Sequence, residues 1–307
     1  MADTITNDGR RETHPSAPGR TVGILGLGLI GSSFARAYHA AGWSVAAFDT
    51  DADTLAISLI DVVDRVLDNQ TIPACDLVIL AAYPQACIDW LESRAELLGK
   101  LGDAGPLVID SAGVKGGLCT RAFELARTHG FAFCGAHPMA GTEHSGYAYG
   151  TADLFAGAPM VLVPPAQNDP ERLDLLDRAH TLLAPCGFGS FSVATPGQHD
   201  RVIAFTSQLA HIVSNAYVKS PTAQTHHGFS AGSYRDLTRV AHLNPDMWSE
   251  LMIADAPYLI EELDVLIGSL EAYRDALSSA DGDRLRSLLA EGDRIKRQLD
   301  DMPQPRR

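Results

Sequence analysis

The chain has 307 residues, of which 46% are apolar and 20% charged, a balance that suits one large or two modest cores and excludes a disordered, collagen-like or coiled-coil chain. Its net charge of −14 argues against partners that are nucleic acids or anionic membranes. Apolar runs such as 77–83 are far shorter than the roughly 18–20 residues of a membrane helix, and the polar N-terminus is not a secretory signal, so we expect a cytoplasmic protein.

Five cysteines stand at positions 75, 87, 119, 134 and 186. Their number is odd and none forms a CxxC pair, so neither a disulfide framework nor a zinc site is indicated. We expect free thiols that are buried as small apolar side chains, and no metal.

The order of the expected elements along the chain predicts the class of fold. Residues 1–20 are polar and are expected to form a flexible tail. Short β-branched runs then alternate with helical patterns. The expected strands are 21–25, 44–48, 77–82, 107–110, 131–135 and 160–163, and the expected helices are 30–41, 85–98 and 115–128. This alternation predicts an α/β domain with a mostly parallel sheet covered by helices.

After Pro196 the strand patterns stop. Residues 199–219, 247–277 and 281–300 carry apolar residues at helical spacing, with Pro257 marking a kink or break. We therefore expect two domains, over residues 21–196 and 197–302, of which the second is all-helical. Its apolar stripes are long for so small a core, and we expect some of them to pack against a second subunit.

Residues 21–33 read TVGILGLGLIGSS and place Gly26, Gly28 and Gly31 in a GxGxxG pattern between a strand and a helix. The first glycine permits a tight turn, the second lets a pyrophosphate approach the backbone, and the third lets helix and strand pack closely. Free N–H groups at the helix start, around Leu29 and Ile30, would face the phosphates. The pattern predicts a Rossmann-type dinucleotide-binding domain, with a glycine-rich turn that binds nothing as the alternative.

Asp49 follows the next strand, 18 residues after Gly31, where a carboxylate can hold the adenosine ribose hydroxyls. A carboxylate repels a 2′-phosphate, so NAD is preferred over NADP as the cofactor. Two further turns at the carboxyl edge of the sheet, at Ala81–Ala82 and at Ser111, are expected to pass near the cofactor.

Residues 135–146 read GAHPMAGTEHSG and follow a strand at the same edge. A neutral His137 beside a nicotinamide ring would suit a general base that takes a hydroxyl proton as hydride leaves. The residue after it, Pro138, restricts the backbone and helps to hold the imidazole. A purely structural histidine in a glycine-rich loop is the alternative for this segment taken alone.

A second polar cluster lies in residues 228–245, which read GFSAGSYRDLTRVAHLNP. Arg235 and Arg239 are four residues apart and would share one face of a helix, with Asp236 between them. A planar guanidinium there could grip a substrate carboxylate. A solvated charged helix face is the alternative.

These segments together resemble the prephenate dehydrogenases and the related arogenate, or cyclohexadienyl, dehydrogenases of tyrosine synthesis. The resemblance covers roughly residues 22–275 and rests on GLGLIGSS (26–33), DSAGVK (110–115), GAHPMAGTEHSG (135–146), HD (199–200) and YRDLTRVAHLNPDMW (234–248). It implies a Rossmann-type domain followed by an all-helical domain that forms a homodimer, and NAD-dependent oxidative decarboxylation of a small-molecule substrate.

The resemblance also implies residue roles. His137 matches the base that accepts the proton of the ring C4 hydroxyl. Arg239 matches the arginine that binds a substrate carboxylate, while Glu143 and Asp236 match acids of the pocket rim. Ser111 belongs to the cofactor side.

Two positions depart from the family pattern. Gly113 stands where the family commonly has a serine that hydrogen-bonds the catalytic histidine and the substrate hydroxyl. The family's Ser-His-Leu-Pro-His reads here as Ser207, Gln208, Leu209, Ala210 and His211. These departures leave open prephenate, arogenate or a 4-amino-4-deoxy analogue as the substrate that Gly113, Gln208 and His211 would face.

Other functions are weaker hypotheses. Residues 228–232 match the GxSxG of serine hydrolases, but no strand pattern precedes them as that motif requires. Adjacent His226 and His227 diverge and lack a third metal ligand. A non-catalytic NAD-binding module is disfavoured because His137 and Arg239 are both present.

Overall fold

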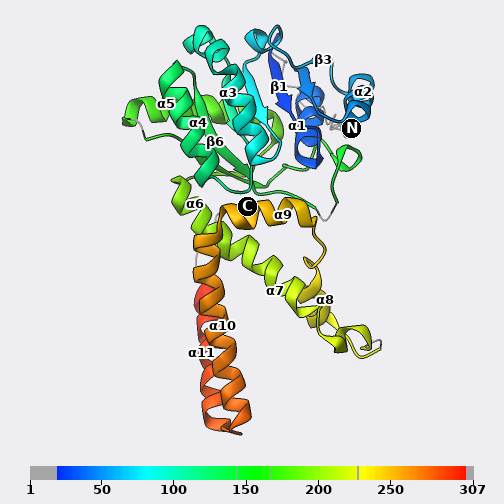
Figure 1. The fold of residues 1–307 in the computed structure, drawn as a ribbon, viewed down its shortest axis with the longest axis vertical. Helices are drawn as coiled ribbons and strands as arrows, with labels where there is room; N and C mark the ends of the chain where they lie inside the picture. Colours follow the sequence, from blue (N-terminus) through cyan, green and yellow to red (C-terminus); the bar gives the residue numbers. More distant parts are fainter. Residues whose placement is uncertain (1–18, 143, 167, 227, 302–307) are drawn as a thin grey trace, which may run out of the picture.

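The computed structural model describes residues 19–142, 144–166, 168–226 and 228–301. Of the tail expected over residues 1–20, only Gly19 and Arg20 are described. The protein divides into an α/β part that carries a single sheet and a set of helices that extends away from it (Figure 1).

The sheet has eight strands in the order β3-β2-β1-β4-β5-β6-β7-β8. All neighbouring strands are parallel except β6 and β7. The bounds are β1 Thr21–Leu25, β2 Ser44–Phe48, β3 Arg65–Val66, β4 Leu77–Leu80, β5 Leu107–Asp110, β6 Phe133–Pro138, β7 Pro159–Val163 and β8 Ser190–Val193. This confirms the predicted α/β, Rossmann-type arrangement, in which a central parallel sheet begins with the strand before the glycine pattern.

Helices pack on both faces of the sheet, because the central strands are apolar on both sides. Strands β1, β4 and β5 are buried along their whole length, as expected for parallel strands covered twice. The helices of this part are α1 Leu29–Ala40, α2 Ala52–Asp61, α3 Pro84–Leu101, α4 Gly116–His129 and α5 Asp169–Leu183. One core cluster includes residues of α1 and α5, and the other includes residues of α3 and α4.

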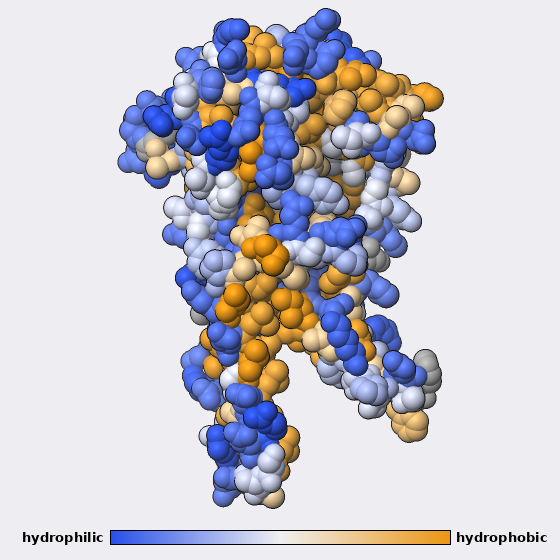
Figure 2. Space-filling view, in the orientation of Figure 1, coloured by the Kyte–Doolittle hydropathy of each residue, from blue (hydrophilic) through white to orange (hydrophobic). Residues whose placement is uncertain are grey.

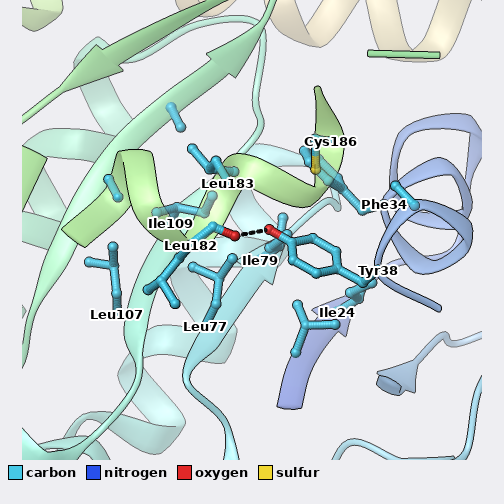
Figure 3. Packing of buried hydrophobic residues seen from close by; sticks show 14 of the residues in the cluster. Ile24, Phe34, Tyr38, Leu77, Ile79, Leu107, Ile109, Leu182, Leu183 and Cys186 are labelled. Carbon is cyan, nitrogen blue, oxygen red and sulfur yellow. Dashed lines mark hydrogen bonds between the residues drawn. The ribbon is translucent and has the colours of Figure 1, made fainter. Parts of the chain in front are cut away.

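Tyr38 of α1 shows how the first of these clusters is tied together. Its ring lies among Ile24, Phe34 and Ile79, and its hydroxyl donates a hydrogen bond of 2.8 Å to the carbonyl oxygen of Leu182 (Figure 3). A buried hydroxyl needs such a partner, so this contact connects the N-terminal helix to α5, late in the same part of the chain.

Most predicted elements are confirmed, and the differences are shifted bounds and four elements that the patterns did not predict. The expected strands 21–25, 44–48 and 107–110 have the predicted bounds. The strand expected over 131–135 begins at Phe133 and continues to Pro138, so His137 lies in the strand rather than in the loop after it. The sequence patterns did not predict β3, β8, α2 or α5. Strand β3 has two residues, both exposed, and so carries no burial pattern.

Beyond β8, all regular elements of the described chain are helices. They are α6 Pro196–Ile203, a π-helical turn Ala204–Leu209, α7 Ala210–Tyr217, α8 Gly232–Thr238, α9 Pro245–Ala254, α10 Ala256–Ser278 and α11 Gly282–Asp300, with short 3-10 turns such as Pro221–Gln224. The break expected at Pro257 is confirmed, since Asp255 ends α9 and Pro257 lies in the first turn of α10, where proline is tolerated.

The helical part buries little apolar surface of its own. Among the described residues, its core cluster has three buried members, Ala204, Leu209 and Leu259. The hairpin of α10 and α11 extends away from the sheet, and α7 and α8 extend in a different direction (Figure 1). No helix within the described ranges is long and apolar enough to cross a bilayer.

All five cysteines are buried and unpaired, as predicted. Burial raises the pKa of the thiols, for example to about 12 at Cys75. They are therefore protonated and unreactive at neutral pH.

Candidate active site

The turn between β1 and α1 contains three glycines, and each is surrounded differently. Gly26 has a φ of +86°, and a Cβ there would lie 2.5 Å from the carbonyl oxygen of Ala81. A Cβ on Gly31 would lie 1.8 Å from the carbonyl oxygen of Gly26. A Cβ on Gly28 would meet no atom within 4 Å. Gly26 and Gly31 are thus required by the fold, whereas Gly28 faces open space at the N-terminus of α1, as a phosphate cradle requires.

Asp49 connects this turn to the end of β2. Its carboxylate accepts the N–H of Leu27 at 2.6 Å and the N–H of Asp51 at 2.9 Å. The side chain is half-buried, so it is held at the sheet edge while part of it faces solvent. A carboxylate held in this way could hold the ribose hydroxyls of a bound dinucleotide.

The other predicted cofactor residues lie at the same edge. Leu29 and Ile30 form the first turn of α1, and Ala81 and Ala82 follow β4. Ser111 follows β5, and its N–H donates to the carbonyl oxygen of Leu80 at 3.0 Å. The structure therefore brings the candidate cofactor residues together along the carboxyl ends of β1, β2, β4 and β5.

A buried ion pair lies against the backbone that precedes His137, the candidate base. Lys115 and Asp110 have no exposed side-chain surface, and the Lys115 ammonium donates to Asp110. The ammonium also donates to the carbonyl oxygen of Ala136 at 2.7 Å. Asp110 in turn accepts the N–H of Ala136 at 3.1 Å and that of Ala112 at 2.9 Å. These bonds fix the backbone immediately before His137, and the sequence patterns gave them no role.

His137 lies near the end of β6, opposite Val161 of β7. Burial, and after it the charge of Lys115 and the neighbouring His199, lowers its pKa well below the usual value. The imidazole is therefore neutral at physiological pH, as a general base must be.

His199 and Asp200 of α6 complete a chain of side chains behind His137. His137 Nδ1 lies 2.9 Å from His199 Nε2, and His199 Nδ1 lies 2.7 Å from Asp200 Oδ1. Sequence reasoning noted these two residues only as part of a family motif. The adjacent His and Asp in the first turns of an expected helix could have suggested a functional pair. Nothing in the neighbouring sequence, however, indicated that they would contact His137.

The two positions that depart from the family pattern have different surroundings. Gly113 lies near Leu251 of α9, and a Cβ there would be 3.5 Å from it, an ordinary contact. Gln208 is buried in the π-helical turn, and its amide donates to Asp255 at 3.0 Å. Burial, and after it the charge of Asp200, raises the pKa of Asp255 to about 7. No hydrogen bond in the described chain joins Gln208 to His137.

The candidate carboxylate-binding residues form a separate group at α8. Arg239 caps α8 and is exposed, as is Asp236. Next to the cap, His211 Nδ1 donates a hydrogen bond of 2.8 Å to the carbonyl oxygen of Val240, and His211 lies against Trp248 with ring centroids 4.0 Å apart. Burial lowers the pKa of His211, and the charge of Arg239 adds to this. Glu143 lies outside the described residues.

A metal centre finds no support in the described part of the chain, where no three His, Cys, Asp or Glu side chains gather in a way that could hold an ion. His227 lies outside the described residues.

Comparison with known sequences identifies relatives of both parts of the chain. Residues 34–187 match the family described as prephenate dehydrogenase, nucleotide-binding domain, and residues 195–291 match prephenate dehydrogenase, dimerization domain. A cyclohexadienyl dehydrogenase from Zymomonas mobilis is 30% identical over 287 residues, covering 90% of this chain and 94% of that protein. Prephenate dehydrogenase from Bacillus subtilis is 27% identical, covering 86% of this chain and 72% of that protein.

Solved structures agree with these relatives. An arogenate dehydrogenase from Synechocystis has a TM-score of 0.70 at 26% identity and matches 90% of this chain and 99% of its own. A prephenate dehydrogenase from Aquifex aeolicus, solved with hydroxyphenyl propionate and NAD+, shares the fold with a TM-score of 0.73 at 24% identity, covering 92% of this chain and 98% of that chain.

The contrast between Gly28 and Gly31 can be tested with alanine substitutions. Gly31→Ala places a Cβ against backbone that cannot move away, so we expect a loss of more than about 2 kcal/mol in the free energy of unfolding. Gly28→Ala meets no protein atom, so stability should change by less than about 0.5 kcal/mol, while NAD affinity falls about tenfold or more because the methyl takes phosphate space. Urea unfolding and calorimetric titration measure the two effects; unchanged NAD affinity in Gly28→Ala would contradict the cradle.

The buried ion pair can be tested by removing one charge and then both. Lys115→Met leaves the Asp110 carboxylate buried without its cation, and we expect the free energy of unfolding to fall by about 3–5 kcal/mol. Adding Asp110→Asn to Lys115→Met should restore part of that loss. Urea denaturation of the three variants gives the coupling energy, and a single-variant cost below about 1 kcal/mol would show that the pair is not what fixes this region.

Proposed function

Because the chain belongs to the prephenate dehydrogenase family, we propose that it oxidises and decarboxylates prephenate or arogenate with NAD, in the synthesis of tyrosine. Both family regions match in the expected order, and the match extends over nearly the whole of the cyclohexadienyl dehydrogenase from Zymomonas mobilis. The products are 4-hydroxyphenylpyruvate from prephenate and tyrosine from arogenate.

The observation that carries this proposal is the neutral, oriented imidazole of His137, at the edge of the sheet that carries the candidate cofactor residues. Its pKa is lowered well below the usual value, and its Nδ1 is engaged by His199. A neutral imidazole with Nε2 outside this contact can accept a proton from a substrate hydroxyl. The residue is held by β6 and by the ion pair behind it, so the base is preorganised.

The reaction follows from what these residues do. His137 accepts the proton of the C4 hydroxyl, and Arg239 binds a substrate carboxylate. A bound NAD would supply the acceptor for the hydride of that ring carbon. The ring carboxylate then leaves as carbon dioxide, and the ring becomes aromatic. Arg239 contributes similar binding to ground and transition states, since the carboxylate it holds is charged in both.

Asp49 supports NAD rather than NADP as the cofactor. Its carboxylate is fixed by the N–H groups of Leu27 and Asp51 and so cannot easily turn away from a 2′-phosphate. The negative charges of a carboxylate and a neighbouring 2′-phosphate repel each other, whereas the 2′-hydroxyl of NAD can donate a hydrogen bond to the carboxylate.

A specialised substrate is the second candidate. Gly113 lacks the hydroxyl that the family commonly places beside the base, and the Gln208 amide is engaged by Asp255. A 4-amino-4-deoxy analogue of prephenate carries an amine at C4 and needs a different partner there. This observation makes the analogue the alternative to prephenate and arogenate.

A turnover panel tests the proposal and the role of His137 together. We expect NADH formation with prephenate or arogenate, and a kcat/KM for NAD at least about tenfold above that for NADP, about 1.4 kcal/mol. His137→Asn should lower kcat by roughly 10²–10⁴ while the substrate still binds. Since the base must be neutral, kcat/KM should fall only as the pH drops through the lowered pKa of His137, below the ordinary histidine value of about 6.5.

The same panel contains the results that would reject the proposal. Preference for the 4-amino analogue by a large factor over both prephenate and arogenate would favour the second candidate. Near wild-type kcat in His137→Asn would assign the base elsewhere. Gly113→Ser, which adds a side chain where ordinary contact distance is available, serves as the matched variant and should preserve or raise prephenate turnover.

The helical part supports a homodimer. Helix α10 carries Ile260, Ile267, Leu270 and Leu277 at near-heptad spacing, with exposed fractions of 50–64%. Apolar side chains also gather between the α10–α11 hairpin and the α7–α8 arm (Figure 2). Exposed apolar stripes of this length are uncommon on monomers, and the matching family is described as a dimerization domain. A second copy of this chain is the partner that fits.

The stripe can be tested by placing a charge on it. We expect the protein to sediment as a dimer and Ile267→Glu to shift it toward monomer, because a dimer would have to bury the carboxylate. Leu173→Glu in α5, equally apolar and 63% exposed, is the control and should remain dimeric. Analytical ultracentrifugation at micromolar concentration decides; a monomeric native protein would contradict the proposal.

A further inference from the structure

A chain of hydrogen bonds runs from His137 through His199 to Asp200, and it ends at the N-terminus of α4. Asp200 accepts the backbone N–H of Lys115 at 2.8 Å and that of Gly116 at 2.7 Å. These two residues begin α4, so the Asp200 carboxylate caps that helix. Both oxygens act as acceptors, and the position of the carboxylate is fixed by backbone on the α/β side of the molecule.

The fixed acceptor determines which nitrogen of each ring carries the proton. Since Asp200 accepts, His199 Nδ1 must be the N–H that donates to it across 2.7 Å. With one proton on the His199 ring, its Nε2 is the acceptor in the 2.9 Å contact with His137. His137 Nδ1 is then the donor. Its Nε2 is left with a free lone pair, the form that a base needs.

We propose that His199 and Asp200 are positioning residues that hold His137 in the tautomer with Nε2 unprotonated, and that they supply the orientation which Gly113 cannot. The proposal rests on the proposed function of His137 as the base. In this proposal His199 and Asp200 do not contact the substrate, and Asp200 does not take a proton from His199.

No other polar side chain described near the departures has this geometry. The Gln208 amide donates to Asp255, and the Ser111 hydroxyl is directed to the carbonyl oxygen of Leu80 at 3.4 Å. Gly113 has no side chain to offer. His199, by contrast, is buried and held at both ring nitrogens.

The start of α6 gives His199 and Asp200 a rigid base. Thr195 and Gln198 form a reciprocal capping box at the N-terminus of α6, which satisfies two of its free N–H groups. His199 and Asp200 follow at once, in the next turn. The helix start and the α4 cap together restrict both side chains, so they can restrict the imidazole that they contact.

Two substitutions of His199 separate positioning from packing. His199→Gln keeps an amide oxygen near the place of Nε2 and can still accept from His137, whereas His199→Leu fills similar volume and cannot. We expect kcat to fall about 10–100-fold in His199→Leu and to recover most of that loss in His199→Gln, with KM within about threefold in both. Equal kcat values in the two variants would overturn the proposal.

Asp200→Asn weakens the anchor of the chain. The amide has one acceptor oxygen where the carboxylate uses two, so its NH2 faces either the Gly116 N–H, or the Lys115 N–H together with His199 Nδ1. The second placement reverses both ring contacts and leaves a proton on His137 Nε2, the change that in the serine-protease triad lowers kcat by about 10⁴. Because only one of the two placements has this effect, we expect kcat to fall at least about tenfold, with KM little changed. Arg201→Gln, on the exposed side of the same helix, is the control and should keep native kcat, since surface ion pairs contribute little.

A measurement without substrate distinguishes this proposal from the proposed function. In long-range ¹H–¹⁵N spectra of the histidine-labelled protein, assigned with His137→Asn and His199→Gln, both rings should be in the Nδ1–H tautomer. Finding His137 as the Nε2–H tautomer would reject the positioning role even if prephenate is turned over. The expected tautomers in a protein that oxidises none of the substrates tested would support the positioning chain and reject the proposed substrate.

Discussion

The candidate active site depends on one buried ion pair. Lys115 and Asp110 are both removed from solvent, where an unpaired charge costs several kcal/mol. Asp110 ends β5 and accepts the N–H of Ala136, while Lys115 donates to the carbonyl oxygen of the same residue. The pair therefore fixes the backbone next to His137. Burial lowers the pKa of His137 most, and the Lys115 cation adds to this, so the pair fixes the place of the proposed base and contributes to its neutral state.

The order of the strands brings His137, the proposed base, to the edge of the sheet that carries the candidate cofactor residues. Strands β1, β2, β4, β5 and β6 are parallel neighbours, so their carboxyl ends meet at one edge, where ligands bind in open parallel sheets. The glycine turn, Asp49, Ser111 and His137 follow or end different strands of this set. The antiparallel β7 pairs with His137 and Pro138, and β8 forms the edge of the sheet beyond it.

The helical part has two roles that explain why it buries few apolar residues of its own. Helix α6 reaches the start of α4 through Asp200 and contacts His137 through His199, so the helical part completes a site that the sheet begins. Helix α10 instead presents Ile267 and Leu270 outward. A segment with so few buried residues of its own gains its stability from neighbours, the α/β part on one side and, in the proposed dimer, a second copy on the other.

The sequence by itself determined the features that depend on short-range backbone geometry. The spacing of Gly26, Gly28 and Gly31, the acid at Asp49 and the alternation of strands with helices indicated the fold and the cofactor edge, because steric limits on turns act within a few residues. The tertiary structure alone decided which side chains meet across the chain. His137 and His199 are 62 positions apart and Gln208 and Asp255 are 47 apart; their contacts depend on how α6 lies against α4 and on where α9 ends. Strand β3 likewise had no local pattern, because its residues are exposed and only pairing with β2 makes them a strand.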